Sequence, residues 1–287
     1  MLKIFLDSIS HFRPCIKPIL RYISYNIEEF SGVNELKRET PIIVSLSSNE
    51  EHFDNLELTL YSLLNQKVCP DRIILWLSDE YELLDLPYSI TRFIKNGLEI
   101  RFVEEKGSYT AIINALKEFE KAINVLASDN VYYPRDWLKK LYHSYISNPA
   151  DIHAHTSLKV LSSNGQVSSY KNWARVNRIE SAEYTNYPLF YGGILYPPNC
   201  YKKEVFREDI YKTKVKTDWE LWSWCMAVVS NRKVRVVKNH IESFRVFNYL
   251  NIITNEYKKL KKYQYFDMQL SKLMDYYKQN IDLQLGK

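Results

Sequence analysis

Asp129 is the residue of this 287-residue chain whose position points most directly to chemistry. It follows the apolar run 123–127 and stands between Ser128 and Asn130. If that run is a buried strand of a parallel sheet, Asp129 lies at the carboxyl end, where such sheets bind their ligands. A carboxylate there can hold Mg²⁺ or Mn²⁺ on a diphosphate. The alternative is a turn or helix cap, which Asn130 and the nearby Pro134 favour.

Two further acids, Asp218 and Glu220, stand at the opening of a predicted helix over 218–229. Acids in a first turn commonly serve only the helix dipole. A general base that takes a proton from a substrate hydroxyl must also be a carboxylate or a histidine in a cleft, and either acid can fill that role.

Gly192 and Gly193 form a pair that lets the backbone approach a bulky ligand closely, although a β-bulge explains such a pair equally well. His153 and His155 lie two residues apart and share one face of a strand. No third ligand accompanies them, so we predict no metal site there.

The elements that must position these residues follow from the apolar pattern. Segments 55–66 and 110–122 have helical spacing, and four short runs are typical of buried parallel strands: 42–46, 72–77, 98–103 and 123–127. Strands that alternate with helices predict a mostly parallel α/β sheet. Its carboxyl edge then carries the loops 47–52 and 128–130.

The second half of the sequence is less regular. A hairpin-like turn is expected at 162–165 between runs 158–161 and 167–170, and a tyrosine-rich helical pattern extends from 244 to 285. We therefore divide the chain into a basic helical flank (1–40), one α/β domain (41–237) and a second basic helical flank (238–287).

The positive charge of the chain, +5 overall, is concentrated near the two ends. Residues 231–262 carry nine lysines and arginines against two acids, and residues 1–22 carry four against one. Such clusters suit anionic lipid or nucleic acid. Because no nucleic-acid-binding motif accompanies them, we predict an anionic membrane surface and no nucleic-acid partner. The first helix also has an apolar stripe that could instead dock on its own domain.

Cysteine usage and hydropathy indicate the compartment. Cys15, Cys69, Cys200 and Cys225 form no close pair, which argues against a disulfide framework or a zinc site. Neither a signal peptide nor an apolar run of about 18 residues is evident. We expect a cytoplasmic protein, with peripheral contact to the inner face of the cell membrane as the sharper alternative.

Six segments in one order resemble a family of bacterial family-2-like glycosyltransferases of capsule and lipopolysaccharide biosynthesis. They are 41–48 (PIIVSLSS), 63–66 (LLNQ), 70–78 (PDRIILWLS), 129–138 (DNVYYPRDWL), 192–198 (GGILYPP) and 220–222 (ELW), with a weaker likeness at 267–270 (DMQL). The resemblance implies a GT-A type fold with a Rossmann-like half that binds a nucleoside diphosphate sugar. It further implies a glycan or lipid-linked acceptor and, from the likeness alone, an inverting reaction.

The resemblance also implies roles for individual residues. Asp129 matches the middle of an aspartate cluster that holds Mg²⁺ or Mn²⁺, with Asn130 beside it. Glu220 matches the base, and Gly192 and Gly193 match the floor of the acceptor site. The residues expected at the nucleotide sugar are Ser47, Ser48, His52, Lys106, Ser108, Tyr109, Ser128, Asp129 and Asn130.

Several functional positions depart from the family pattern. The triple aspartate reads Ser128-Asp129-Asn130, and a lysine pair reads Thr110-Ala111. An arginine expected after the first strand is His52, Leu189-Phe190-Tyr191 replaces a glycine-rich stretch, and the first of two paired aspartates is Trp219. Each change removes charge or ligands from the site. Two readings follow: a metal-independent transferase that neutralises the diphosphate with Lys106, His52 or the basic tail, or a non-catalytic relative that acts as a binding partner.

Overall fold

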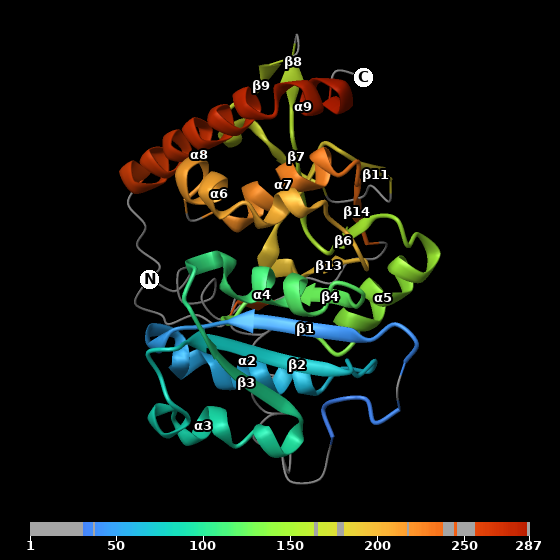
Figure 1. Ribbon diagram of the computed structural model, residues 1–287, viewed down its shortest axis with the longest axis vertical. Coiled ribbons are helices and arrows are strands. Elements are labelled where there is room, and N and C mark those ends of the chain that lie inside the picture. Colours follow the sequence, from blue (N-terminus) through green and yellow to red (C-terminus); the bar gives the residue numbers. More distant parts are fainter. Residues whose placement is uncertain are drawn as a thin grey trace, which may run out of the picture.

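The computed structural model describes residues 31–36, 38–163, 166–176, 181–216, 218–237, 244–245 and 256–285 (Figure 1). The helix expected near the N-terminus lies outside these residues, as does most of the stretch 238–255.

The first half of the chain builds the parallel sheet that the apolar runs predict. Its strands β1 (Ile42–Ser47), β2 (Arg72–Ser78), β3 (Leu98–Val103) and β4 (Ile123–Leu126) lie in the order β3-β2-β1-β4, and all three pairings are parallel. Helices α2 (Phe53–Leu64), α3 (Tyr88–Thr91) and α4 (Thr110–Glu118) connect them. The helix predicted over 110–122 stops at Glu118, because Phe119 leaves the helical conformation as the chain turns into β4.

Beyond β4 the sheet becomes mixed. Strand β13 (Ile194–Tyr196) pairs antiparallel with both β4 and β6 (Ile152–Ala154). Strand β14 (Val234–Val236) runs parallel to β6, and β11 (Ala182–Glu183) completes the edge. The eight strands described for this sheet therefore follow the order β11-β14-β6-β13-β4-β1-β2-β3.

Smaller strands lie outside this sheet. Strand β7 (Ser157–Lys159) pairs with β10 (Ala174–Arg175) and β12 (Asn186–Pro188), and the expected hairpin is confirmed by β8 (Ser162–Ser163) and β9 (Gln166–Val167). Strand β5 (Val131–Tyr132) pairs with β15 (Phe244–Arg245). The expectation that the chain is helical from residue 244 is therefore wrong at its start, because this pair lies in a ladder with β5.

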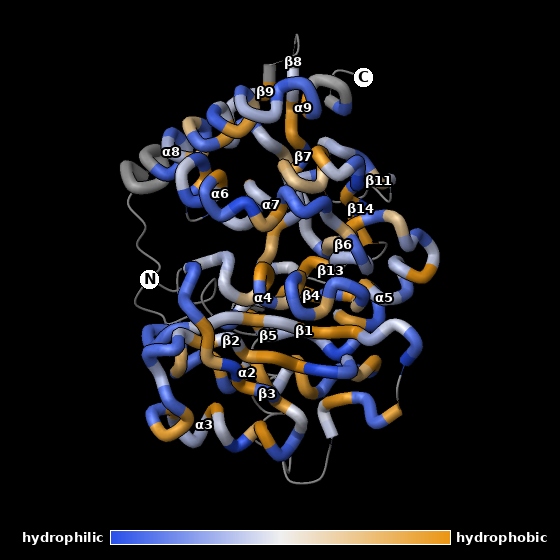
Figure 2. Tube along the Cα trace, viewed as in Figure 1, coloured by the Kyte–Doolittle hydropathy of each residue, from blue (hydrophilic) through white to orange (hydrophobic). Residues whose placement is uncertain are grey.

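The helices cover both faces of the sheet, as Figure 1 shows. Alternate residues of β1 enter opposite cores: Val44 packs with α2 and with α5 (Trp137–Ser147), whereas Ile43 packs with α4 and α7 (Trp219–Val229). On the second face lie also α6 (Glu208–Lys214), α8 (Glu256–Tyr276) and α9 (Lys278–Leu285). Figure 2 shows apolar residues running along β1 and β2 between these layers.

Helix α8 is fixed to the second face by one side of its length. The Phe266 ring lies 4.2 Å from the ring of Tyr170, measured between centroids, and a carboxylate oxygen of Asp267 accepts a 2.8 Å hydrogen bond from the Tyr170 amide. Within the described part of the chain, no helix is long and apolar enough to cross a membrane.

Candidate functional site

A cleft of about 580 Å³ opens at the carboxyl ends of β1, β2 and β4. Ser47 and Ser48 enter it from the end of β1, Ser78 from the end of β2, and Ser128 and Asp129 from the loop after β4. This is the edge at which the sequence places its ligand. The predicted nucleotide-sugar residues that line the cleft are Ser47, Ser48, His52, Ser108, Ser128, Asp129 and Asn130.

Asp129 joins the loop after β4 to the loop after β1. Its Oδ2 accepts a 2.7 Å hydrogen bond from the Ser48 hydroxyl and lies 2.8 Å from Nδ1 of His52. The backbone oxygen of Asp129 accepts a 2.8 Å bond from Thr59 on α2. The carboxylate side chain is only 10% exposed, whereas that of His52 is 41% exposed. Asp129 is thus a buried anchor that orients His52 at the cleft surface.

Ser128 and Asn130, the two neighbours of Asp129, form a hydrogen bond with each other, and Ser128 also bonds to another residue of the loop. The Ser128 hydroxyl donates a 3.0 Å hydrogen bond to Oδ1 of Asn130, and the Ser128 amide donates to the Tyr133 hydroxyl at 2.7 Å. The carboxylates expected at 128 and 130 in the resembled family are here replaced by neutral oxygens that are bonded together.

The loop after β4 carries one acidic side chain, Asp129. No group of three histidine, cysteine or acidic side chains that could hold an ion occurs among the described residues. His153 and His155 point into the interior instead: Nδ1 of His153 lies 2.8 Å from the Ser144 hydroxyl, and Nε2 of His155 donates to the Trp137 carbonyl at 3.0 Å. Asp129 is therefore a single carboxylate already holding two partners, which is a poor set for a hard divalent cation.

The cleft continues into a deeper part of about 440 Å³ beside the start of α7. Its two parts share five lining residues, which are Ser47, Ser108, Phe190, Glu220 and Lys262. The deeper part adds Asp218, Trp219, Tyr265, Phe266 and Gln269. Aromatic rings, acids and an amide therefore line this part of the cleft.

Glu220 is half-buried between the two parts. Its Oε1 accepts a 2.6 Å hydrogen bond from the backbone amide of Phe190, which fixes the carboxylate toward the cleft wall. Because Glu220 lines both parts, its carboxylate can reach a molecule that spans them.

Asp218 is the N-cap of α7, and its Oδ1 accepts a 3.0 Å hydrogen bond from the Leu221 amide. Burial raises the pKa of this carboxyl, while the bond from Leu221 and the positive charge of Lys262 act in the opposite direction. Both acids are half-buried, and they differ in their contacts: Asp218 holds the helix start, and Glu220 lines both parts of the cleft.

The two predicted acceptor-site glycines have a packing role in this structure. Gly193 has φ +87°, and a Cβ atom on it would lie 2.4 Å from the ring of Trp137. A Cβ on Gly192 would lie 2.6 Å from the Thr156 hydroxyl, and the Gly192 carbonyl accepts a 2.8 Å bond from the Trp137 indole. Neither glycine lines the described cleft, whose wall is formed there by Leu189, Phe190 and Tyr191.

Lys106 and Tyr109 also lie apart from the cleft lining. The Lys106 ammonium lies 2.8 Å from a carboxylate oxygen of Glu104 and 3.1 Å from one of Glu208, and its side chain is only 8% exposed. Tyr109 is buried and stacks on Tyr211 at 4.3 Å between centroids. Two carboxylates thus hold Lys106 outside the cleft lining, and its role at a diphosphate stays a prediction.

Sequence reasoning missed several lining residues, notably Trp76, Tyr170, Phe190 and Lys262. Trp76 read as a residue of a buried strand, Tyr170 as part of a hairpin, and Phe190 as one of three residues that replace an expected glycine-rich stretch. Lys262 belongs to the basic tail, and the helical spacing Lys262, Tyr265, Phe266 and Gln269 is the one signal that could have placed it on the side of α8 that faces the domain.

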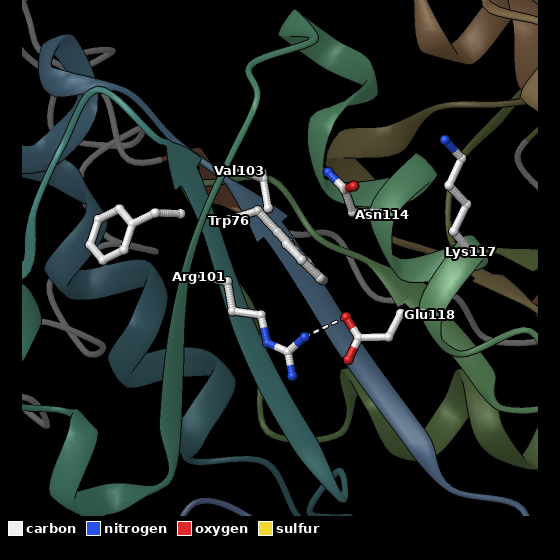
Figure 3. A pocket seen from close by; sticks show the side chains of 7 residues that line it. Trp76, Arg101, Val103, Asn114, Lys117 and Glu118 are labelled. Carbon is white, nitrogen blue, oxygen red and sulfur yellow. Dashed lines mark hydrogen bonds and ion pairs between the residues drawn. The ribbon is translucent and has the colours of Figure 1, made fainter.

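A separate groove of about 520 Å³ runs between β3 and α4 (Figure 3). The Arg101 guanidinium lies 5.4 Å from the Trp76 ring centroid and pairs with Glu118, as the dashed line in Figure 3 marks. None of the residues predicted to bind substrate lines this groove. We therefore take the cleft at the carboxyl edge as the candidate site.

Neither a protein-family model nor a curated protein sequence matches the chain. Among solved structures, it is similar to a mannosyltransferase from Pyrobaculum calidifontis in complex with GDP-Man and Mn²⁺, with TM-score 0.53, 14% identity, and coverage of 93% of this chain and 74% of that one. An inositol-1-phosphate CTP transferase from T. maritima matches at TM-score 0.45 and 14% identity, over 83% of this chain and 98% of that one. The second likeness is too weak to support any argument.

At 14% identity, the first likeness establishes the fold alone. The chain has a GT-A type α/β fold, with a large sheet whose first half is parallel and with helices on both faces.

Proposed function

We propose that this protein is a glycosyltransferase that moves a sugar from a nucleoside diphosphate sugar to a hydroxyl of a glycan or lipid-linked glycan. The observation that carries the proposal is the place of Glu220, which lines both the strand-edge part and the deeper part of one cleft. A donor at the strand edge and an acceptor in the deeper part would meet beside this carboxylate. The neighbour that contains GDP-Man supports a nucleotide-sugar donor on this fold.

The cleft offers hydroxyl and imidazole groups where the donor would lie. Ser47, Ser48 and Ser108 line it, and the Asp129 carboxylate holds His52 at its surface. At the inner end, the buried Oε1 of Gln269 has no hydrogen-bond partner within the described residues. An unpaired buried acceptor beside aromatic rings suits a sugar hydroxyl, which can donate to it.

The reaction that fits is an inverting displacement. The acceptor oxygen attacks the anomeric carbon, its proton passes to Glu220, and the bond from that carbon to the diphosphate oxygen breaks to release the nucleoside diphosphate. Asp218 stays as the helix cap. We place the reaction in bacterial surface polysaccharide synthesis, and the anionic membrane partner remains a prediction that rests on the basic flanks.

A non-catalytic relative that binds nucleotide or glycan in an assembly is the second candidate. It is favoured by the neutral pair Ser128 and Asn130 and by the withdrawal of Lys106 onto Glu104 and Glu208. Calorimetric titration with UDP- and GDP-sugars, followed by an assay of nucleotide release, separates the two. Binding without turnover on any acceptor supports the second candidate.

The role of Glu220 is tested by Glu220→Gln, which should keep the fold and the donor affinity but lower kcat by at least about a hundredfold. Asp218→Asn is the matched control and should cost mainly stability, about 1 kcal/mol in the free energy of unfolding. If the two variants exchange phenotypes, Asp218 is the base; if neither changes turnover, the base lies elsewhere.

A further inference from the structure

The charge balance of the cleft raises a question that the proposed function leaves open. A nucleoside diphosphate carries negative charge into a site that already holds Asp129, Glu105 and Glu220 on its walls. On this fold, a divalent ion can offset such charge, as Mn²⁺ is present in the mannosyltransferase structure. The oxygens around Asp129 do not suit one here, because Ser128 and Asn130 bond each other and Asp129 holds Ser48 and His52.

Lys262 is the permanent positive charge that the described cleft contains. It lines both parts of the cleft, and no other lysine or arginine does so among the described lining residues. Its field also reaches the inner end, since it works against the burial that raises the pKa of Asp218. His52, which also lines the strand-edge part of the cleft, can add a hydrogen-bond donor.

The packing of α8 fixes where Lys262 lies. One helical turn after Lys262, Phe266 is buried against Tyr170, and Asp267 accepts a hydrogen bond from the Tyr170 amide. Tyr170 is itself a lining residue. Because residues four apart share one helix face, docking of Phe266 turns the Lys262 side chain toward the cleft.

We infer that Lys262 is the phosphate-binding cation of a donor site that works without a bound divalent metal. The inference rests on the proposed function, since it concerns the diphosphate of the donor. Helix α8 thereby supplies the positive charge that a metal ion held by the loop after β4 would otherwise provide. In this arrangement the ligand is a nucleoside diphosphate whose phosphate oxygens accept hydrogen bonds from the Lys262 ammonium and from the serine hydroxyls of the cleft.

The test measures the binding of UDP and GDP to the full-length protein by calorimetry, once in EDTA and once with Mn²⁺. We expect the preferred diphosphate to bind with a Kd that differs by less than about threefold between the two conditions. Lys262→Ala should weaken this binding about tenfold or more, since it removes a hydrogen bond between two charged groups. Lys262→Arg should restore most of it.

Lys272→Ala is the matched control, because Lys272 is an exposed lysine of the same helix that lines neither part of the cleft. It should bind like the wild type. The effect of Lys262→Ala should also be larger for the diphosphate than for the corresponding nucleoside, which a general loosening of α8 would not produce.

Two outcomes overturn the inference in different ways. Binding that requires Mn²⁺ and is unchanged in Lys262→Ala rules out Lys262 as the cation but leaves the proposed transferase intact. Failure of either nucleotide to bind under both conditions overturns the proposed function itself, and the inference falls with it.

Discussion

At the scale of single residues, the hydrogen bonds of Asp129 give this carboxylate a positioning role that needs no metal. Its Oδ2 is shared by Ser48 and His52, so that the loops after β1 and β4 depend on one atom. The position of Asp129 at a strand end was evident from the sequence. Its partners were not, because they lie 77 and 81 residues earlier in the chain.

Asp129→Ala should therefore impair donor binding and turnover more than Asn130→Ala. Removal of Oδ2 frees His52 and Ser48 from their fixed orientation, and the loss of a charged hydrogen bond corresponds to about tenfold to a hundredfold in kcat/KM. The measurement is the rate of nucleotide release at limiting donor. In a double-mutant cycle, Asp129→Ala and His52→Ala should be clearly less than additive, because each breaks the same contact. Equal and mild effects of the two single changes at 129 and 130 would show that the loop is merely a turn.

At the scale of elements, the long apolar strands were predictable and the short ones were not. The run at 42–46 is buried from end to end and the run at 72–77 is buried from Ile73 onward, which a sequence pattern reveals directly. Strands β6, β13 and β14 have three residues each, too few to show a period. The helix α7 was predictable from its cap and its apolar residues, but its contact with Ser108 and the cleft depends on tertiary packing.

The glycine pair before β13 belongs to this scale, since it decides how closely the chain passes α5. Gly193→Ala places a methyl group 2.4 Å from the Trp137 ring at a positive φ, and we expect a loss of about 3 kcal/mol in the free energy of unfolding. Gly107→Ala is the matched comparison, because Gly107 also has a positive φ, +58°, but no atom within 4 Å of the added carbon. It should cost about 1 kcal/mol, the backbone strain alone. Urea unfolding of both variants measures the difference, and equal losses would contradict the packing role of Gly193.

At the scale of the whole molecule, stability should depend on pH through a buried histidine. His153 is fully buried on β6, and desolvation lowers its pKa to about 4. In the unfolded chain this histidine takes up a proton near pH 6.5, whereas in the folded protein it does so only near pH 4. Its contribution to the free energy of unfolding is therefore fully present above pH 6.5 and is lost as the pH drops toward 4. Between pH 6.5 and pH 4, protonation of His153 should lower the free energy of unfolding by about 3 kcal/mol.

Urea unfolding at several values between pH 7.5 and pH 4.5 tests this dependence. His153→Gln, which cannot gain a proton, should be less stable than the wild type at pH 7.5 but should lose less stability on acidification. His143→Asn changes an exposed histidine of α5 and should follow the wild type. A wild-type pH profile reproduced by His153→Gln would show that other groups control the acid sensitivity.

The position of β13 in the sheet has a consequence for the order in which the protein assembles. Strands β3, β2, β1 and β4 are complete by residue 126, and each finds its neighbour within that stretch. In the described sheet, β6 meets this half only through β13, which begins at Ile194. During synthesis, the edge of β4 therefore stays unpaired until about seventy more residues have been made. Strand β6 is synthesised earlier than β13, but in the sheet it pairs with β13 and not with β4. We expect nascent chains that end between residues 130 and 190 to expose β4 as an unpaired, aggregation-prone edge strand and to need chaperone protection until β13 has been synthesised.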